Sequence, residues 1–294
     1  MRTISTSATL LSILITTTPA RAERTPSTPD GELGVVHLLT SSGSCSAFLV
    51  RPSTFLTAKH CVQLPGAAAE IKSAITIVVD DGGGEKGVAI GPSAVWAAPG
   101  AWTDDFDIDG HDFGVVQLAE HYEKLVPGVT PLPIYQGDVT KLVGREVYQI
   151  GFGFHDGNYT RKRTDTKITD VGTTITVKPA VGCAGDSGGV LLLKDTHEAV
   201  GIASREWPLG SDPCQDPATV TGYREPSATY FQRIDLQAKY IDAPPGPEDA
   251  KPKETSDSSG GCAIGARAGP ASVWLAGLVT ILALFLGNKR PRRT

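Results

Sequence analysis

The stretch Cys183–Gly189, with the sequence CAGDSGG, places glycines on both sides of one serine. Glycine adopts left-handed and tightly turned backbone conformations at little steric cost, so this stretch predicts a sharp turn that presents the Ser187 hydroxyl. In such a turn the backbone N–H groups of Gly185 and Ser187 can point at one spot, where they would stabilise negative charge on an oxygen. The turn therefore contains a candidate nucleophile next to a candidate anion-binding site.

A serine hydroxyl is a weak nucleophile, so this interpretation requires a base, and an acid that orients the base, elsewhere in the chain. The segment TAKHC, residues 57–61, supplies His60, and the segment HDFGVVQL, residues 111–118, supplies Asp112. The apolar run after Asp112 predicts a buried strand, which would place the carboxylate at the mouth of that strand. There it can accept the histidine N–H and fix the tautomer of the ring.

These three motifs occur in the order histidine, aspartate, serine, and together they resemble the motifs of the trypsin/chymotrypsin family of serine peptidases. The family usually has TAAHC and DIALLxL where this chain has TAKHC and DFGVVQL, and the resemblance spans roughly residues 33–242, the implied peptidase domain. It implies a serine-type endopeptidase in which Ser187 attacks the substrate carbonyl and forms an acyl-enzyme. His60 would carry the proton and Asp112 would orient His60. The N–H groups of Gly185 and Ser187 would form the oxyanion hole.

The implied partner of such an enzyme is a protein or peptide substrate, and its chemistry requires no metal and no cofactor. A second hypothesis belongs to another functional class. In it the chain is a catalytically silent homologue that acts as a surface binding or adhesion module. Such homologues typically lose one of the three catalytic residues, and this chain keeps all three. The formal net charge of −5 argues against nucleic acid as a partner.

Composition and pattern favour an all-β fold. The 294 residues include 33 glycines and 21 prolines, which predict many turns. Short apolar and β-branched runs, typical of strands, occur at residues 34–39, 46–50, 55–58, 75–79, 113–118, 147–153, 168–178, 190–193, 199–204 and 228–234. By resemblance we expect two antiparallel six-stranded β-barrels, with the active site in the cleft between them and a short C-terminal helix over residues 235–241.

The chain has five cysteines, an odd number for a secreted protein. The resemblance implies a Cys45–Cys61 disulfide that fixes the histidine loop. A Cys183–Cys214 disulfide would clamp the segment that bears the serine. Such bonds require oxidising surroundings. Cys262 is then left alone in the C-terminal tail.

The resemblance also implies a pocket for the substrate side chain that precedes the cut. Val181, six residues before the serine, would lie at the floor of this pocket, and Ala228 would replace a wall glycine. A shallow apolar pocket of this kind favours small or medium uncharged side chains. The segment that begins at Ser204, a further pocket residue, is longer than usual in the family, so Glu206 or Asp212 could instead reach the pocket and attract a basic side chain. We favour the apolar pocket, because a charge on a long surface loop is more often solvated than aimed inward.

Residues 1–22 resemble a secretory signal peptide, with Arg2, an apolar core and the cleavage pattern ARA at residues 20–22. Residues 23–32 are a polar, proline-containing arm and lack the apolar IVGG start that the family usually carries. In the family, the freed N-terminal amine pairs with the aspartate before the serine. We therefore expect Asp186 to have a different partner in this chain.

Residues 243–261 are rich in Pro, Ser, Glu, Lys and Gly without an apolar period, which predicts a disordered linker. Residues 270–286 are an almost unbroken apolar run, just long enough for a transmembrane helix, and the basic residues that follow would stay cytoplasmic. Together with Cys262, the tail of residues 262–294 resembles the surface-sorting tail of myxobacteria, in which the cysteine marks a processing site. A plain transmembrane anchor is the alternative. We expect an exported bacterial protein held at the cell surface or membrane, with a sorting peptidase as a further partner.

Overall fold

The computed structural model of the chain describes residues 24–26, 34–41, 43–63, 75–78, 91–99, 111–155, 157–208, 211–212, 214–215 and 221–242. The expected signal peptide, linker and C-terminal tail lie outside these residues. By its internal contacts the chain divides into two units, Met1–Lys251 and Pro252–Thr294, and all of the described residues belong to the first. Within the described part of the chain, no helix is long and apolar enough to cross a membrane.

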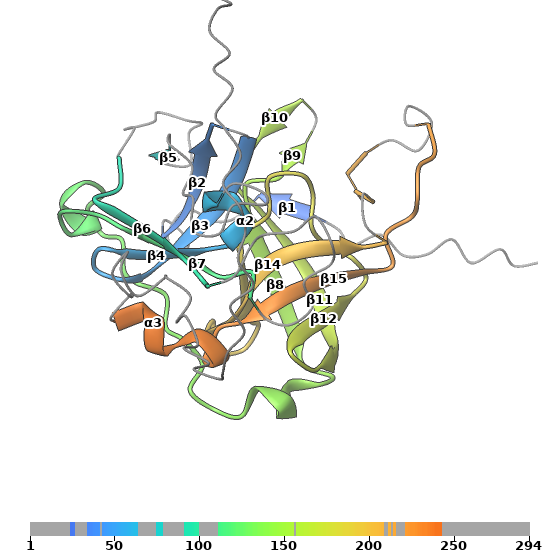
Figure 1. The fold of residues 1–294 in the computed structure, drawn as a ribbon. Helices are drawn as coiled ribbons and strands as arrows, with labels where there is room; N and C mark the ends of the chain where they lie inside the picture. The colour runs from blue at the N-terminus through green and yellow to red at the C-terminus, as the bar shows by residue number, and fades with distance from the viewer. Residues whose placement is uncertain are drawn as a thin grey trace, which may run out of the picture. The chain divides into compact units, whose positions relative to one another are not determined.

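The regular secondary structure of the described chain is mostly β-strand, which confirms the predicted fold class, and its strands form two large antiparallel sheets (Figure 1). The first sheet has six strands in the order β5–β2–β3–β4–β7–β6. Their bounds are β2 Val35–Thr40, β3 Gly43–Arg51, β4 Thr54–Thr57, β5 Ile75–Val78, β6 Ala94–Ala97 and β7 Gly114–Gln117.

This first sheet is an open half-barrel, which corrects the expectation of a second closed barrel. Its two edges are β5 and β6, which have four residues each. Each pairs with one neighbour, β2 or β7, and no pairing joins β5 to β6 among the residues that the structure describes. Strands of this length span only about 13 Å and offer few backbone groups with which to close a sheet.

The second sheet closes into a six-stranded barrel, as predicted. Its strands are β8 Glu146–Gly151, β11 Lys162–Val171, β12 Thr174–Lys178, β13 Val190–Leu193, β14 Ala199–Trp207 and β15 Ala228–Arg233. The ten-residue strand β11 makes the closure possible, because it pairs with β8 from Lys162 to Lys167 and with β12 from Lys167 to Val171. A short strand near the N-terminus, β1 Arg24–Pro26, adds to β11 at residues 162–164. A two-stranded hairpin, β9 Phe154–His155 and β10 Asn158–Tyr159, follows β8.

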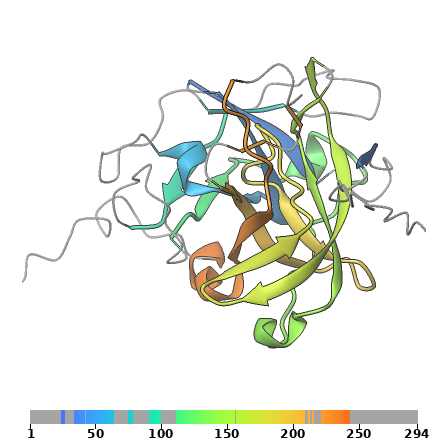
Figure 2. The same ribbon diagram turned by 90° about the vertical axis from the view of Figure 1, so that its right-hand side faces the viewer.

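Apolar side chains fill both sheets. In the closed barrel, a buried cluster that includes Ile168, Ile175 and Phe231 fills the interior. A second cluster fills the half-barrel and continues through Ile150 and Ile202 of the closed barrel, so the two sheets pack against one another. In Figure 2 the yellow-green strands β11 and β12 of the closed barrel face the viewer.

Helices are few and short in the described residues. They are α2 Lys59–Val62 and α3 Lys239–Asp242, with 3-10 turns η1 Tyr122–Lys124, η2 Val139–Leu142 and η3 Asp235–Gln237. The short C-terminal helix that the sequence predicts is present as η3 followed by α3. Tyr240 of α3 packs against Trp96 of β6 with ring centroids 4.5 Å apart, so this helix contacts the half-barrel.

Both predicted disulfides are confirmed. Cys45 of β3 is bonded to Cys61 of α2, with Cα atoms 6.0 Å apart. Cys183 is bonded to Cys214, with Cα atoms 5.6 Å apart. Both separations lie in the usual range for disulfides. The first bond joins β3 to the helix that carries His60, and the second joins the serine turn to the segment after β14.

Candidate active site

Strand pairing in the half-barrel brings His60 and Asp112 together. The strands β4 and β7 are antiparallel neighbours, with Thr57 opposite Gly114 at one end of the pair. His60 follows Thr57 on α2, and Asp112 directly precedes the segment that enters β7. His60 and Asp112 therefore lie at the same end of this strand pair.

The Asp112 carboxylate is completely buried and accepts three hydrogen bonds. Its Oδ2 lies 2.9 Å from His60 Nδ1 and accepts the Ser204 hydroxyl at 2.6 Å, and its Oδ1 accepts the His60 backbone N–H at 3.0 Å. Burial raises the pKa of this carboxyl, but the charge of His60 and the hydrogen bonds from His60 and Ser204 outweigh burial and hold the pKa below its usual range. Asp112 is therefore an anion at neutral pH.

This anion determines the tautomer of His60. A carboxylate can only accept hydrogen bonds, so the proton between the two groups lies on Nδ1, which donates to Asp112. In the neutral ring, Nε2 then has no proton and is left as an acceptor and base. The His60 side chain is 20% exposed, so the ring is accessible on one side while Asp112 is not.

Ser187 lies in a turn that has the backbone expected from its glycines. Gly185 and Gly188 have φ angles of +98° and +82°, in the left-handed region that favours glycine. A side chain at Gly188 would collide with the Ser46 carbonyl oxygen and the Thr57 hydroxyl. The glycine therefore allows the serine turn to approach the half-barrel closely.

Ser46 of β3 fixes this turn to the half-barrel. Its backbone N–H donates to the Ser187 carbonyl at 2.7 Å, and its hydroxyl donates to the Gly185 carbonyl at 2.9 Å. The same hydroxyl oxygen accepts the Phe152 N–H at 2.8 Å, and Ser46 is fully buried. Because β3 also pairs with β4, which leads into His60, these bonds fix the position of the serine turn relative to the histidine.

Asp186 is buried and its side chain turns back on its own loop. Its Oδ2 accepts the Cys183 N–H at 2.8 Å. Gly151 and Gly153 leave room for the carboxylate, because a Cβ at these positions would lie 2.5 Å and 2.6 Å from an Asp186 oxygen. The Cys183 backbone is thus one partner of Asp186 in the described chain.

A cavity of about 360 Å³ opens beside Ser187 and His60. Ser204 and Glu206, which we expected in the pocket, both line it, and Asp212 does so as well. Its wall therefore carries carboxylates, in contrast to the uncharged pocket that we favoured from the sequence.

Val181 and Ala228, the other two residues expected in the pocket, do not line this cavity. Val181 packs in the core of the closed barrel, and its N–H donates to Thr229 Oγ1 at 2.8 Å. Ala228 is 2% exposed and precedes Thr229 on β15, where successive residues face opposite sides of the sheet. Thr229 lines the cavity in place of Ala228. The expected position on β15 was therefore wrong by one residue.

Sequence reasoning missed the contributions of Ser46 and Thr229. Nothing in the local sequence marks Ser46, which follows Cys45 in a run that is typical of a strand. Thr229 could have been found from the period of two along β15 if the register of that strand had been known.

Two groups in the described chain bring a histidine close to two cysteines. One contains His60 with the cysteines of the first disulfide, and the other contains His155 with the cysteines of the second. Disulfide sulfurs are not thiolate ligands, so neither group is a candidate metal site.

Among solved structures, the chain is similar to neuropsin, a serine protease expressed in mouse brain, with 20% identity and a TM-score of 0.55 over 75% of this chain and 97% of that one. Human heparin binding protein is 19% identical, with a TM-score of 0.52 over 76% of this chain and 97% of that one. The protease Anisep from Arthrobacter nicotinovorans is 16% identical, with a TM-score of 0.53 over 75% of this chain and 99% of that one. At these identities the likenesses show the fold alone.

A comparison with curated protein sequences finds no match. The family model described as Trypsin matches residues 25–234, which is more than half of the chain and includes all three sequence motifs. On this match, together with the fold, the chain belongs to the trypsin family.

Proposed function

We propose that this chain is a serine endopeptidase that hydrolyses peptide bonds in proteins or peptides, with residues 33–242 as its peptidase domain. The observation that carries the proposal is the position of the His60 ring. It is bonded to the buried Asp112 anion and borders a cavity that Ser187 also lines. Membership of the trypsin family supports a hydrolase of this class.

In the proposed reaction, Nε2 of His60 takes the proton of Ser187 while the serine oxygen attacks the substrate carbonyl. The ionised Asp112 stabilises the imidazolium that results, and its lowered pKa keeps it charged while it does so. His60 then gives the proton to the leaving amine. Water repeats the same sequence of steps and releases the acyl group from Ser187.

The backbone N–H groups of Gly185 and Ser187 are the proposed oxyanion hole. Within the part of the chain that the structure describes, neither N–H donates a hydrogen bond to another protein group. Both are therefore available to the oxygen that becomes negative during attack. A donor in this role lowers the barrier by about 3 kcal/mol.

Hydrolysis of a general protein substrate tests the proposal. The wild-type chain should cleave denatured casein, and Ser187→Ala should lose about 10⁶-fold in kcat because the nucleophile is gone. Ser93→Ala is the matched control, since the Ser93 hydroxyl is exposed and, among the residues that the structure describes, donates only to the Gln117 carbonyl. Cleavage by Ser187→Ala at the wild-type rate would reject the proposal.

A catalytically silent binding module is the second candidate. Human heparin binding protein shares the fold, so the fold by itself does not decide between catalysis and binding. The retention of His60, Asp112 and Ser187 favours catalysis. A folded wild-type protein that neither cleaves casein nor reacts with a fluorophosphonate would favour the binding module.

We further propose that the protein is exported and held at the bacterial cell surface through residues 262–294. The support is the sequence pattern: a signal-like N-terminus, Cys262, the apolar run at residues 270–286 and the basic end. Truncation after Gly261 should release active enzyme into the medium, whereas the full chain should stay with the cells. Equal retention of the two forms by the cells would contradict this part of the proposal.

A further inference from the structure

Glu206 places a carboxylate in the wall of the cavity beside Ser187. In the register of β14 and β15 it lies opposite Thr229, so the two side chains are neighbours. The Thr229 hydroxyl donates to Glu206 Oε2 at 2.7 Å. Gly182 is a further wall residue, and a Cβ there would collide with Glu206 Oε1. The carboxylate therefore lies directly against the Gly182 backbone.

The Thr229 hydroxyl holds this carboxylate in place. Its oxygen accepts the backbone N–H groups of Val181 at 2.8 Å and of Gly182 at 3.4 Å. Both acceptor positions of the hydroxyl are then used, and its single proton is directed to Glu206. A donor aimed at a carboxylate favours the ionised form, so a negative charge has a fixed position in the cavity wall.

The other charged groups that line the cavity have different surroundings. Both oxygens of Asp212 accept backbone N–H groups, from Cys214 at 2.8 Å and from Ala184 at 3.3 Å. Asp212 therefore fixes the loop around the second disulfide, and Asp186 is bonded to its own turn as described above. Arg205 also lines the cavity and adds a positive charge to it.

We propose that Glu206 makes this cavity a binding site for a positively charged side chain, so that cleavage follows arginine or lysine. The inference rests on the proposed function, because it names the substrate class for the same site. A guanidinium or ammonium group would form charge-assisted hydrogen bonds with Glu206. An apolar side chain would remove water from the carboxylate without replacing its hydrogen bonds, which is unfavourable. The preferred substrate side chain would thus be determined by Glu206 of β14, and not by Val181, which precedes the serine in the sequence.

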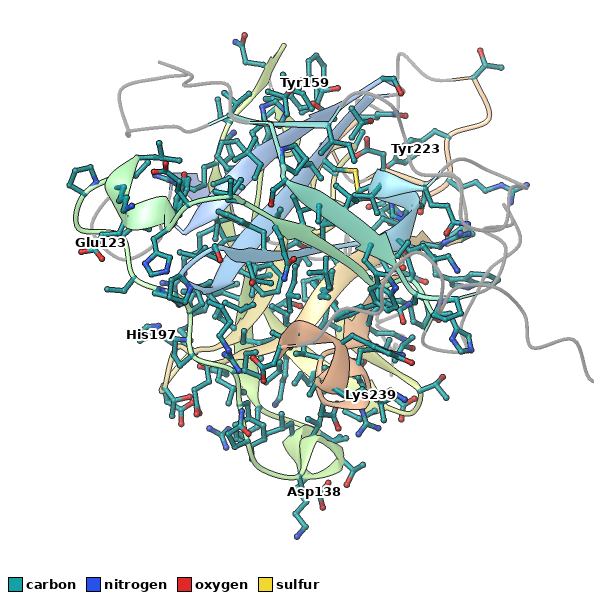
Figure 3. The ribbon with its side chains drawn as sticks, turned by 60° about the vertical axis from the view of Figure 1, so that its left-hand side comes forward. Glu123, Asp138, Tyr159, His197, Tyr223 and Lys239 are labelled. Atoms are coloured by element: carbon teal, nitrogen blue, oxygen red, sulfur yellow. A yellow bond between two sulfur atoms is a disulfide. The ribbon has the colours of Figure 1, made fainter. Side chains whose placement is uncertain are left out.

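Peptides that differ only at the residue before the cut test this preference. We expect kcat/KM for Arg and Lys to exceed that for Ala, Val and Leu by about 10- to 100-fold. Glu206→Gln keeps the shape but removes the charge, and should reduce this ratio by about tenfold or more. Glu123→Gln makes the same chemical change at an exposed residue of η1, labelled in Figure 3, and should leave the ratio unchanged.

Binding of benzamidine separates this inference from the proposed function. Benzamidinium is a small planar cation whose binding needs no catalysis, so calorimetry can measure it in the wild type and in Ser187→Ala. Both proteins should bind it, and Glu206→Gln should raise Kd by about tenfold or more in either background. Glu123→Gln should again have no effect.

The outcomes distinguish the two claims. Benzamidine binding that depends on Glu206 without any peptide cleavage would support the charged pocket and reject the proposed function. Preferred cleavage after Ala, Val or Leu, or benzamidine binding that Glu206→Gln leaves unchanged, would overturn the role of Glu206. A preference for acidic side chains that Arg205→Gln abolishes would assign the specificity to Arg205. That result would also overturn the proposed role of Glu206.

Discussion

The Ser46 hydroxyl donates to the carbonyl oxygen of Gly185 over 2.9 Å, although 139 positions separate the two residues in the sequence. Ser46 belongs to the half-barrel, and Gly185 belongs to the serine turn that leads into the closed barrel. The bond therefore joins the part of the site that carries His60 and Asp112 to the part that carries Ser187. In this chain the geometry of the site depends on a contact between the two sheets.

Ser46→Ala should lower both stability and activity. The substitution removes the buried hydrogen-bond partner of the Gly185 carbonyl and of the Phe152 N–H, which costs about 1–3 kcal/mol in the free energy of unfolding. Urea unfolding measures this loss, and kcat/KM should fall as well because the serine turn is less firmly held. Ser93→Ala, at an exposed hydroxyl, should change stability by less than about 0.5 kcal/mol. Equal effects of the two substitutions would speak against a role of Ser46 in fixing the turn.

Asp112 should stabilise the folded protein in a pH-dependent way. Its pKa in the folded state lies below the ordinary value of 3.8, so the folded protein binds this proton more weakly than the unfolded chain does. The stabilisation is then fully present above the ordinary value and is lost as the pH falls through the lower folded value. The difference in unfolding free energy between wild type and Asp112→Asn should therefore shrink as the pH falls from about pH 5 toward about pH 2. A difference that grows as the pH falls over this range would show that folding does not lower the pKa of Asp112.

Gly182→Ala should weaken the binding of cations without unfolding the protein. The added Cβ would collide with Glu206 Oε1, so the carboxylate would have to leave its bond with Thr229. We expect benzamidine binding to weaken about tenfold, as for Glu206→Gln. Gly172→Ala is the control, because a Cβ at that position meets no atom within 4 Å. Wild-type affinity in Gly182→Ala would mean that the carboxylate does not lie against this glycine.

The fold class, both disulfides and the contact between His60 and Asp112 could be predicted because each follows from a local motif. A cysteine next to the histidine, and an apolar run after the aspartate, are visible within a few residues. The open form of the first sheet could not be predicted in this way. It depends on whether β5 and β6 meet, and their short sequences do not specify a shared partner.

The lining of the pocket could be predicted only in part, because it depends on strand register. The pairing of β14 with β15 shifts between Ala203 and Arg205, and such an irregularity changes which side chains face the cavity. An alignment that is wrong by one residue on β15 exchanges Ala228 for Thr229, since neighbouring residues face opposite sides. Glu206 follows the irregular part of β14, so the sequence left open whether Glu206 or Asp212 reaches the pocket, and the structure shows that both line it.

The most direct test of the central claim is the site at which a fluorophosphonate modifies the protein. The reagent reacts with a serine hydroxyl that a neighbouring base has activated, and mass spectrometry of the digested protein identifies the modified residue. We predict one adduct in the wild type, located on Ser187, and none in Ser187→Ala. A folded wild-type protein that forms no adduct, or forms it on another serine, would contradict the assignment of Ser187 as the nucleophile.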